Sequence, residues 1–497
     1  MLDNLALGFE VALSLNNLTY AFVGAMIGTA IGVLPGVGPT ATIALLLPLT
    51  FGQEPVTAII MLAGIYYGSQ YGGSTTAILL NLPGEISAVV TALEGYKMAR
   101  RGRAGAALAT AALGSFFAGT VATIVVAAVG PILTAVALSF GPADYFSLML
   151  LGLIISAVLA RGNVLKGIAM IALGLALGLV GTDVQTGQQR FTFGIPELSD
   201  GLNVVALAMG LFGIGEIIIN LEKPEIRGTV NGAIGKLWLT REEWRLATPA
   251  VLRGTAIGSI LGVLPGGGAS LSAFTSFMVE RKMTKQPEMF GNGAIEGVAG
   301  PESANNAAAQ TSFIPLLTLG IPSNSVMALM VGALIIQGIQ PGPRMIESQP
   351  ELFWGLIASM WIGNVMLLII NLPMVGMWVK LLAIPYRFLY PAILIFCAIG
   401  VYSYNNSAFD VYLAVMFGGL GYLFYKFGLE PAPLFIAYIL GPMMEEHLRR
   451  AMLLSRGDAM VFVQRPISAV LLGIALIALL AMLAPGLRRK REEAIAE

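Results

Sequence analysis

Charged residues are scarce in this chain of 497 residues, and that scarcity excludes several classes of protein. Asp, Glu, Lys and Arg make up 11% of the sequence, whereas a soluble domain has about 25%. Hydrophobic residues make up 56%. Basic and acidic residues balance at 28 each, and no Lys or Arg occurs before Lys97, so the sequence lacks the basic footprint of a nucleic-acid-binding protein. We therefore expect a protein that resides in a lipid bilayer.

Cysteine and histidine occur once each, as Cys397 and His447. A single cysteine cannot form an internal disulfide, and a single histidine excludes a metal cluster built on histidines. Ser and Asp have no usable His for a nucleophilic triad, and the glycine-rich strings lack the Lys-Ser/Thr of a phosphate-binding loop. The sequence therefore predicts neither an enzyme nor a bound metal or cofactor.

Apolar runs of membrane-spanning length recur along the whole chain. A helix needs about 20 residues to cross a bilayer. Runs close to this length lie at 104–129, 145–160, 164–180, 202–219, 352–372, 390–404, 411–427 and 466–484. The sequence predicts an all-α polytopic integral membrane protein.

Two glycine-proline strings interrupt these apolar stretches. Residues 32–38 read Gly-Val-Leu-Pro-Gly-Val-Gly, and residues 262–268 read Gly-Val-Leu-Pro-Gly-Gly-Gly, at an offset of 230. Proline and glycine break helices. A break is tolerated in hydrocarbon only where protein or a watery cavity surrounds the exposed backbone groups. The alternative is a pair of packing kinks, but the duplication favours a binding site that includes Gly36, Gly38, Gly266 and Gly267.

Other landmarks repeat in the same order, which predicts two homologous halves. Leu82-Pro83-Gly84-Glu85 corresponds to Ile321-Pro322-Ser323-Asn324, and Asn163 corresponds to Asn406. We expect a first membrane repeat at 1–221, a cytoplasmic connector at 222–253, a second repeat at 254–465, and a last transmembrane helix with a basic tail at 466–497.

Charge placement indicates that the two repeats have inverted topology. Basic loops stay in the cytoplasm, and loops that correspond in the two halves differ in basic content: 97–103 carries four basic residues, whereas 342–351 carries one. Arg253 and Arg281 are both expected to be cytoplasmic. The residues between them, 254–280, are therefore expected to form a re-entrant hairpin around the second break, with residues 24–51 as its inverted counterpart.

The glycine- and serine-rich patch 66–76 predicts a further irregular segment. Polar side chains cluster there and beside the breaks, and these supply the candidate binding groups. Half-helix N-termini, Asn, Ser and Thr can bind an anion, and carbonyls at the opposite ends can bind Na⁺. The alternative is that such residues only join helices by hydrogen bonds. Besides the four glycines, the candidates for substrate binding are Ser74, Thr75, Asn81, Ser303, Asn305, Asn306, Ser323 and Asn324. The candidates for ion coupling are Thr40, Thr76 and Glu302, a carboxylate inside an apolar half.

A charged run, Glu445 to Asp458, follows Gly441-Pro442. Arg449 and Arg450 in this run could bind a carboxylate substrate through paired hydrogen bonds. Internal ion pairs in a solvated segment are the favoured interpretation. The topology of residues 431–465 stays open.

Four strings resemble the large permease subunit of the tripartite tricarboxylate transporters. They are residues 32–39 (Gly-Val-Leu-Pro-Gly-Val-Gly-Pro), 71–84 (Tyr-Gly-Gly-Ser-Thr-Thr-Ala-Ile-Leu-Leu-Asn-Leu-Pro-Gly), 301–306 (Pro-Glu-Ser-Ala-Asn-Asn) and 319–322 (Leu-Gly-Ile-Pro). The resemblance implies a carrier in the bacterial inner membrane that takes up citrate-like or other carboxylates, driven by an ion gradient. It also implies a small four-helix membrane subunit and a periplasmic solute-binding protein as partners.

The sequence thus favours an inverted-repeat carrier coupled to Na⁺ or H⁺. Two alternatives stay open, a channel that uses the same breaks as a filter and a membrane scaffold for the soluble partner. A carrier shows saturable, gradient-coupled uptake, whereas a channel needs a continuous polar lining.

The breaks give a first testable prediction. Gly36→Val or Gly266→Val is expected to abolish uptake and leave membrane insertion largely intact, because a branched side chain cannot follow a backbone that needs positive φ or close ligand approach. Uptake and membrane content are measured side by side. A variant that inserts normally and transports at the wild-type rate would make its break a packing kink.

Overall fold

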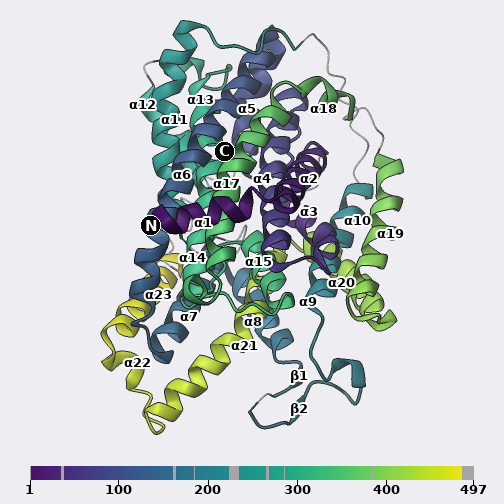
Figure 1. Cartoon of the computed structure of the whole chain (residues 1–497), viewed down its shortest axis with the longest axis vertical. Helices are drawn as coiled ribbons and strands as arrows, with labels where there is room; N and C mark the ends of the chain where they lie inside the picture. The colour runs from purple at the N-terminus through teal and green to yellow at the C-terminus, as the bar shows by residue number, and fades with distance from the viewer. Residues whose placement is uncertain are drawn as a thin grey trace.

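The computed structural model describes residues 2–34, 38–159, 164–183, 185–222, 234–264, 268–284, 286–381 and 386–483. Most of these residues are helical, and their only sheet is an antiparallel pair, β1 (Gly181–Thr182) with β2 (Gln189–Arg190). Figure 1 shows the helices packed into one elongated bundle with this pair projecting at one end. Within the described residues, four helices are long and apolar enough to cross a membrane, or five if the bent pair α1–α2 is one span. The predicted class, an all-helical membrane protein, is confirmed.

The helices of the first half follow in chain order. They are α1 (Leu2–Ala12), α2 (Leu15–Gly32), α3 (Pro39–Leu46) with η1 (Leu47–Thr50), α4 (Pro55–Leu80), α5 (Val89–Met98) with η2 (Ala99–Arg103), α6 (Ala104–Ala137), α7 (Pro142–Leu159), α8 (Val164–Gly178), η3 (Pro196–Leu198), α9 (Val204–Ala208), η4 (Met209–Ile214) and α10 (Gly215–Glu222).

The second half continues with helices of similar length. They are α11 (Arg241–Leu261), α12 (Gly268–Met283), η5 (Pro287–Met289), α13 (Glu296–Thr311), α14 (Phe313–Leu319), α15 (Ser325–Ile336), α16 (Met345–Ser348), α17 (Pro350–Asn371), α18 (Val375–Leu381), α19 (Tyr386–Asn405), α20 (Ala408–Lys426), α21 (Pro431–Leu454), α22 (Val461–Gln464) and α23 (Pro466–Leu483). Each of the eight predicted apolar runs overlaps described helices of the bundle, and the run at 202–219 overlaps α9, η4 and α10.

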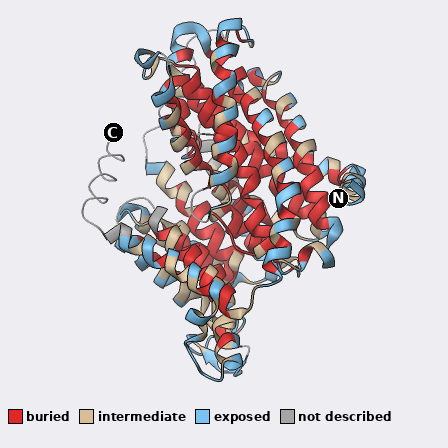
Figure 2. Ribbon diagram, turned by 90° about the vertical axis from the view of Figure 1, so that its left-hand side faces the viewer, coloured by how far each residue is buried: buried red, intermediate tan, exposed pale blue. Residues whose placement is uncertain are grey.

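One local prediction is wrong. The polar patch 66–76 was expected to be irregular, but it lies inside the continuous helix α4. A helix satisfies its own backbone groups, so small polar residues in it need no break to be stable in a membrane. Helix α13 likewise carries buried polar residues on a continuous helix, since all its residues from Glu296 to Thr311 are buried. Figure 2 shows this buried core running along the bundle.

Stripes of glycine let pairs of helices approach each other at backbone distance. A Cβ added to Gly28 or Gly258 would overlap the carbonyl group of the facing helix, at Ile65 and Ala304 respectively. Small residues spaced four apart are a common way to pack membrane helices. In α2 the stripe is Gly24, Gly28 and Gly32 against α4; in α11 it is Gly254, Gly258 and Gly262 against α13. The two glycine stripes thus place α2 on α4 and α11 on α13 in the same kind of close helix crossing.

The later helices of the first half pack against the later helices of the second half. Gly174 of α8 lies against Leu434 of α21, and Gly210 of η4 lies against Ala414 of α20. If α8 corresponds to α20 and the α9–α10 segment to α21, the contact of α8 with α21 is equivalent to the contact of η4 with α20. Each contact then joins one helix of a half to the corresponding partner helix of the other half. This exchange fits two repeats, and the inversion of their topology stays a prediction.

The described residues on either side of the second break, 254–264 and 268–280, lie in two helices arranged as the two arms of the expected hairpin, and the re-entrant path of this hairpin stays a prediction. Helices α11 and α12 flank the second break, and the Arg253 guanidinium donates to both oxygens of Glu280, from Nε at 2.8 Å and from Nη2 at 2.5 Å. The two ends of the hairpin therefore lie side by side. The first break is flanked in the same way by α2 and α3, and its central residues 35–37, like 265–267 in the second, lie outside the described residues.

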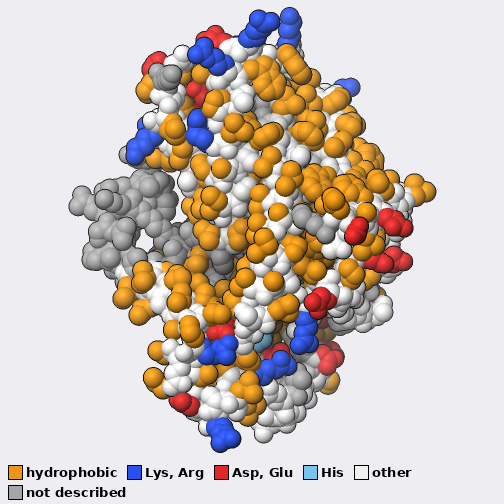
Figure 3. All heavy atoms as spheres, turned by 60° about the vertical axis from the view of Figure 1, so that its left-hand side comes forward, with side chains coloured by type: hydrophobic (Ala, Val, Ile, Leu, Met, Phe, Trp, Pro, Cys, Tyr) orange, Lys and Arg blue, Asp and Glu red, His pale blue; other side chains and the backbone are white. Residues whose placement is uncertain are grey.

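The predicted cytoplasmic segments gather at one end of the bundle. Arg103 pairs with Glu243, Lys97 donates to the carbonyl of Gly291, and Gly105 N–H donates to Ile234 O at 2.6 Å. The connector is partly helical, because α11 begins at Arg241 with a capping box between Thr240 and Glu243. Figure 3 shows apolar side chains over most of the face in view, with Lys and Arg gathered towards its two ends.

The glycine crossings give a stability prediction. Gly258→Leu is expected to destabilise the fold by about 1–3 kcal/mol or more, because the side chain is forced into the backbone of α13. The matched control is Gly419→Leu on α20, where an added Cβ meets nothing within 4 Å. Thermal unfolding of both variants in detergent measures the difference, and equal melting temperatures would contradict the close crossing.

Candidate functional site

The candidate site is built around α13, a polar helix buried at the centre of the bundle. It packs against α4, α5, α6, α11 and α12, so its polar side chains face other helices. Polar groups buried this way are stable only when they are hydrogen-bonded. The partners of these side chains therefore show what the site is made of.

The carboxylate of Glu302 is bound by hydroxyl groups from two helices. Ser74 of α4 donates to its Oε2 at 2.6 Å, and Thr91 of α5 donates to its Oε1 at 2.5 Å. All three residues are buried. Two helices of the first half thus meet a carboxylate of the second half.

A second buried carboxylate, Glu85, lies next to this cluster. Asn305 Nδ2, one turn after Glu302, donates to Glu85 Oε1 at 3.1 Å. An added Cβ on Gly73 would come within 3.2 Å of Glu85 Cγ, so Glu85 packs against the residue before Ser74. In the same loop, Ser87 Oγ donates to Gln70 Oε1 at 3.4 Å. The two carboxylates therefore flank the same turn of α4.

Three helix N-termini meet near these carboxylates. Thr40 in the first turn of α3 and Ser325, the first residue of α15, share a hydrogen bond of 2.9 Å between their hydroxyl groups. Gly268, the first residue of α12, lies against the side chain of Asn324, which caps α15 by accepting from Met327 N–H at 2.9 Å. Helix N-termini carry partial positive charge and free N–H groups. An arrangement of this kind favours an anion.

Three buried polar atoms of the predicted site residues lack a hydrogen-bond partner among the described residues. They are Ser303 Oγ, Asn305 Oδ1 and Ser323 Oγ. A buried polar atom without a partner costs about 1–3 kcal/mol. Such atoms indicate a place where water or a ligand completes the hydrogen bonding.

The structure brings together some predicted site residues and not others. Ser74, Asn305 and Glu302 belong to the carboxylate cluster, and Thr40, Ser323, Asn324 and Gly38, the N-cap of α3, lie around the helix N-termini. Thr75 and Thr76 donate to backbone carbonyls, Thr76 to Val33 O at 2.6 Å, and Asn306 donates to Ser115 and to Glu302 O. Asn81 ends α4 with φ of 57° and is exposed. Gly36, Gly266 and Gly267 lie outside the described residues.

The sequence reasoning missed Glu85, Thr91 and Gln70. Glu85 carried a usable signal, because it is a carboxylate beside a repeated Pro-Gly landmark in an apolar stretch. Thr91 carried none, since a threonine in a helix is commonplace and its partner Glu302 is 211 residues away. No group of three or more His, Cys, Asp or Glu that could hold a metal occurs in the ranges described.

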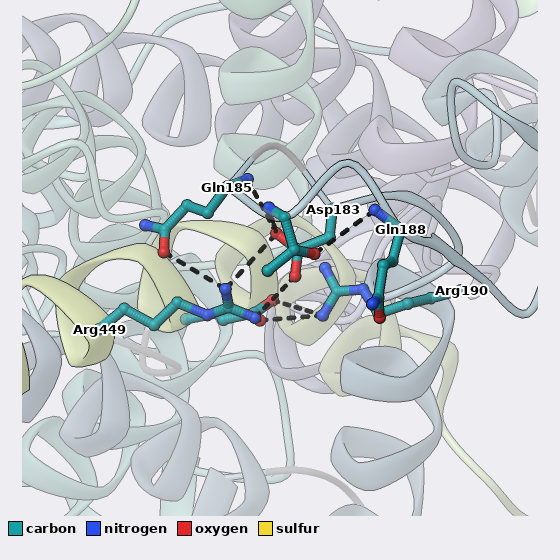
Figure 4. A network of polar contacts seen from close by, with 7 residues as sticks. Asp183, Gln185, Gln188, Arg190 and Arg449 are labelled. Carbon is teal, nitrogen blue, oxygen red and sulfur yellow. Dashed lines mark hydrogen bonds and ion pairs between the residues drawn. The ribbon is translucent and has the colours of Figure 1, made fainter.

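Arg449 and Arg450 are engaged in ion pairs, as the favoured interpretation of the charged run predicts. Arg449 pairs with Asp183 at 2.8 Å and with Glu445 at 2.6 Å, and Arg190 also contacts Glu445 at 2.9 Å (Figure 4). Arg450 pairs with Glu446. The backbone N–H of Gln185, aided by Arg449 and by Thr186, lowers the pKa of Asp183 to about 2. This network fastens the β1–β2 hairpin to the end of α21.

Comparisons with known proteins give the same assignment as the motifs. The sequence profile of the "Tripartite tricarboxylate transporter TctA family" matches residues 18–436. No solved structure matches the chain.

Two curated relatives come from Agrobacterium vitis. The "Uncharacterized 52.8 kDa protein in TAR-I ttuC' 3'region" is 60% identical over 497 residues, covering 100% of this chain and 99% of the relative. The "Uncharacterized protein in TAR-II ttuC' 3'region" is 63% identical over 240 residues, covering 48% of this chain and 99% of the relative. The profile match spans most of the bundle, including both breaks, α4 and α13. The chain belongs to the tripartite tricarboxylate transporter TctA family, which is a family of transporters and not of enzymes.

Proposed function

We propose that this chain is the large membrane subunit of a secondary transporter that takes up carboxylates across the bacterial inner membrane. In this proposal an ion gradient drives uptake, a periplasmic solute-binding protein delivers the substrate, and a small multi-helix membrane subunit completes the complex. The observation that carries the proposal is the meeting of the N-termini of α3, α12 and α15 beside Asn324.

Such a meeting point suits an anion better than any other ligand class. Each helix N-terminus stabilises a nearby negative charge by about 0.3–1 kcal/mol, and by up to about 2 kcal/mol when partly buried. Thr40, Asn324 and Ser325 are partly buried and add hydroxyl and amide groups. A citrate-like substrate with several carboxylates can use more than one helix end.

The position of the meeting point supports a carrier. Helix α3 belongs to the first half of the chain, and α12 and α15 belong to the second. The contacts Thr40–Ser325 and Ser74–Glu302 also join the halves. A substrate bound here is held between two bodies that can move apart on either side in turn, as alternating access requires.

Reconstitution tests the proposal directly. The chain is placed in proteoliposomes with its small membrane subunit and binding protein, and uptake of labelled citrate and labelled succinate is measured under separate Na⁺ and pH gradients. We expect saturable uptake that responds to one gradient. Uptake that rises linearly with substrate and ignores both gradients would identify a channel, and no transport of any carboxylate would favour a scaffold.

The unpartnered hydroxyl of Ser323 gives a sharper prediction. Ser323→Ala removes no hydrogen bond from the folded protein, so the melting temperature without substrate is expected to stay unchanged. If the hydroxyl binds a substrate carboxylate, its loss costs about 1.5–3 kcal/mol, or roughly ten- to a hundredfold in KM.

Ser359→Ala is the matched control. Ser359 is a buried serine whose hydroxyl donates to Leu356 O at 2.7 Å on its own helix α17. Its substitution is expected to leave KM as in the wild type. An unchanged KM in Ser323→Ala would remove this residue from the substrate site. Asn305→Ala, tested in parallel, is expected to raise KM or to uncouple transport.

A further inference from the structure

Glu85 and Glu302 form a pair of buried carboxylates whose hydrogen-bond donors are neutral. Glu302 accepts from the hydroxyls of Ser74 and Thr91, and Glu85 accepts from the amide of Asn305. Taking two negative charges out of water without positive partners is costly. Intramembrane carboxylates in such surroundings are usually functional.

Titratable groups on α4, α5 and α12 surround the pair, and of these Tyr71, Glu94 and Glu280 have partners of their own. On α4, the hydroxyl of Tyr71 faces Glu302 and donates to Asn364 Oδ1 at 3.0 Å, and Tyr66 faces Glu85. On α12, Glu280 is paired with Arg253. On α5, Glu94 accepts from the backbone N–H groups of Gly291, Gly293 and Ala294. On α6, Ser115 faces the backbone of Glu302.

One hydrogen-bond acceptor beside the pair, the side-chain oxygen of Asn305, has no donor among the described residues. Asn305 Nδ2 donates to Glu85, yet Asn305 Oδ1 is buried and has no partner. An amide oxygen can only accept, so it needs a hydrogen-bond donor or a cation. A proton on a neighbouring carboxyl group supplies such a donor.

The local backbone favours a proton over Na⁺ at Glu302. Transporters coordinate Na⁺ with carbonyls of unwound backbone and of half-helix ends. At Glu302, Ser74 and Thr91 the helices α13, α4 and α5 are continuous, so their carbonyls are used inside the helices, apart from the carbonyl of Gly297, to which Pro301 has no N–H to donate. The two hydroxyl groups that contact Glu302 are sufficient to hydrogen-bond one carboxyl group together with the proton that it binds.

We infer that Glu85 and Glu302 together bind the coupling proton, so that this chain is a proton–carboxylate symporter. The inference rests on the proposed function and names its coupling ion. One proton adds to a carboxylate oxygen of the pair and leaves from the same oxygen on the other side of the membrane. The neutralised pair repels an anionic substrate less, and Tyr66 lies near both Glu85 of the pair and Asn324 at the helix N-termini.

The test separates exchange from accumulation in proteoliposomes that contain the whole complex, with labelled citrate and labelled succinate as probes. Counterflow needs substrate binding and the conformational change but no net proton movement, whereas accumulation driven by a pH gradient needs both. We expect Glu302→Gln and Glu85→Gln to lower accumulation driven by a pH gradient at least about fivefold more than they lower counterflow. The matched control Glu296→Gln neutralises another buried glutamate of α13, which is bound by Thr284 at 3.2 Å, and is expected to keep both activities.

A second measurement does not depend on the variants. Adding citrate or succinate to the detergent-solubilised wild-type complex in weak buffer is expected to raise the pH, because substrate and proton bind together. Absence of proton uptake with the substrate that supports counterflow, accumulation driven by a Na⁺ gradient alone, or pH-driven accumulation retained in Glu302→Gln would each overturn the inference. No counterflow with any carboxylate in the wild type would overturn the proposed function itself, which makes the two failures distinguishable.

Discussion

The fold depends on backbone-to-backbone packing along glycine stripes. In the membrane interior a helix gains little from burying apolar side chains, so close van der Waals contact replaces the hydrophobic effect. The stripe on α2 brings that helix onto α4, and the stripe on α11 brings it onto α13. Because α4 and α13 are the two polar helices of the centre, the same crossings that hold the bundle together also bury its polar side chains.

Much of this architecture could be predicted from the sequence, because its causes are local. Hydropathy places the helices, the glycine-proline strings place both breaks, and basic residues on either side of 254–280 predict the hairpin that the Arg253–Glu280 pair closes. The patch 66–76 is helical, although its glycines and serines predict an irregular backbone. In α4 the glycines at four-residue spacing serve helix packing.

The candidate site could be predicted only in part, for a different physical reason. Ser74, Asn305 and Glu302 stood out as polar residues near breaks, but which residue faces which is decided by the tertiary crossing. Thr91 meets Glu302 across 211 residues, and Thr40 meets Ser325 across 285. Such pairs follow from the angle and register of packed helices, and no local pattern carries that information.

The hydrogen bond between Thr40 and Ser325 has a mechanical consequence. The three helix ends sit on different halves of the protein, α3 on the first and α12 and α15 on the second, so their combined electric field exists only while the halves are in contact. In the proposed carrier, a rocking motion that separates α3 from α15 would also divide this field and lower the affinity for an anion. Opening of the proposed site would then itself promote release of the substrate, without a separate trigger.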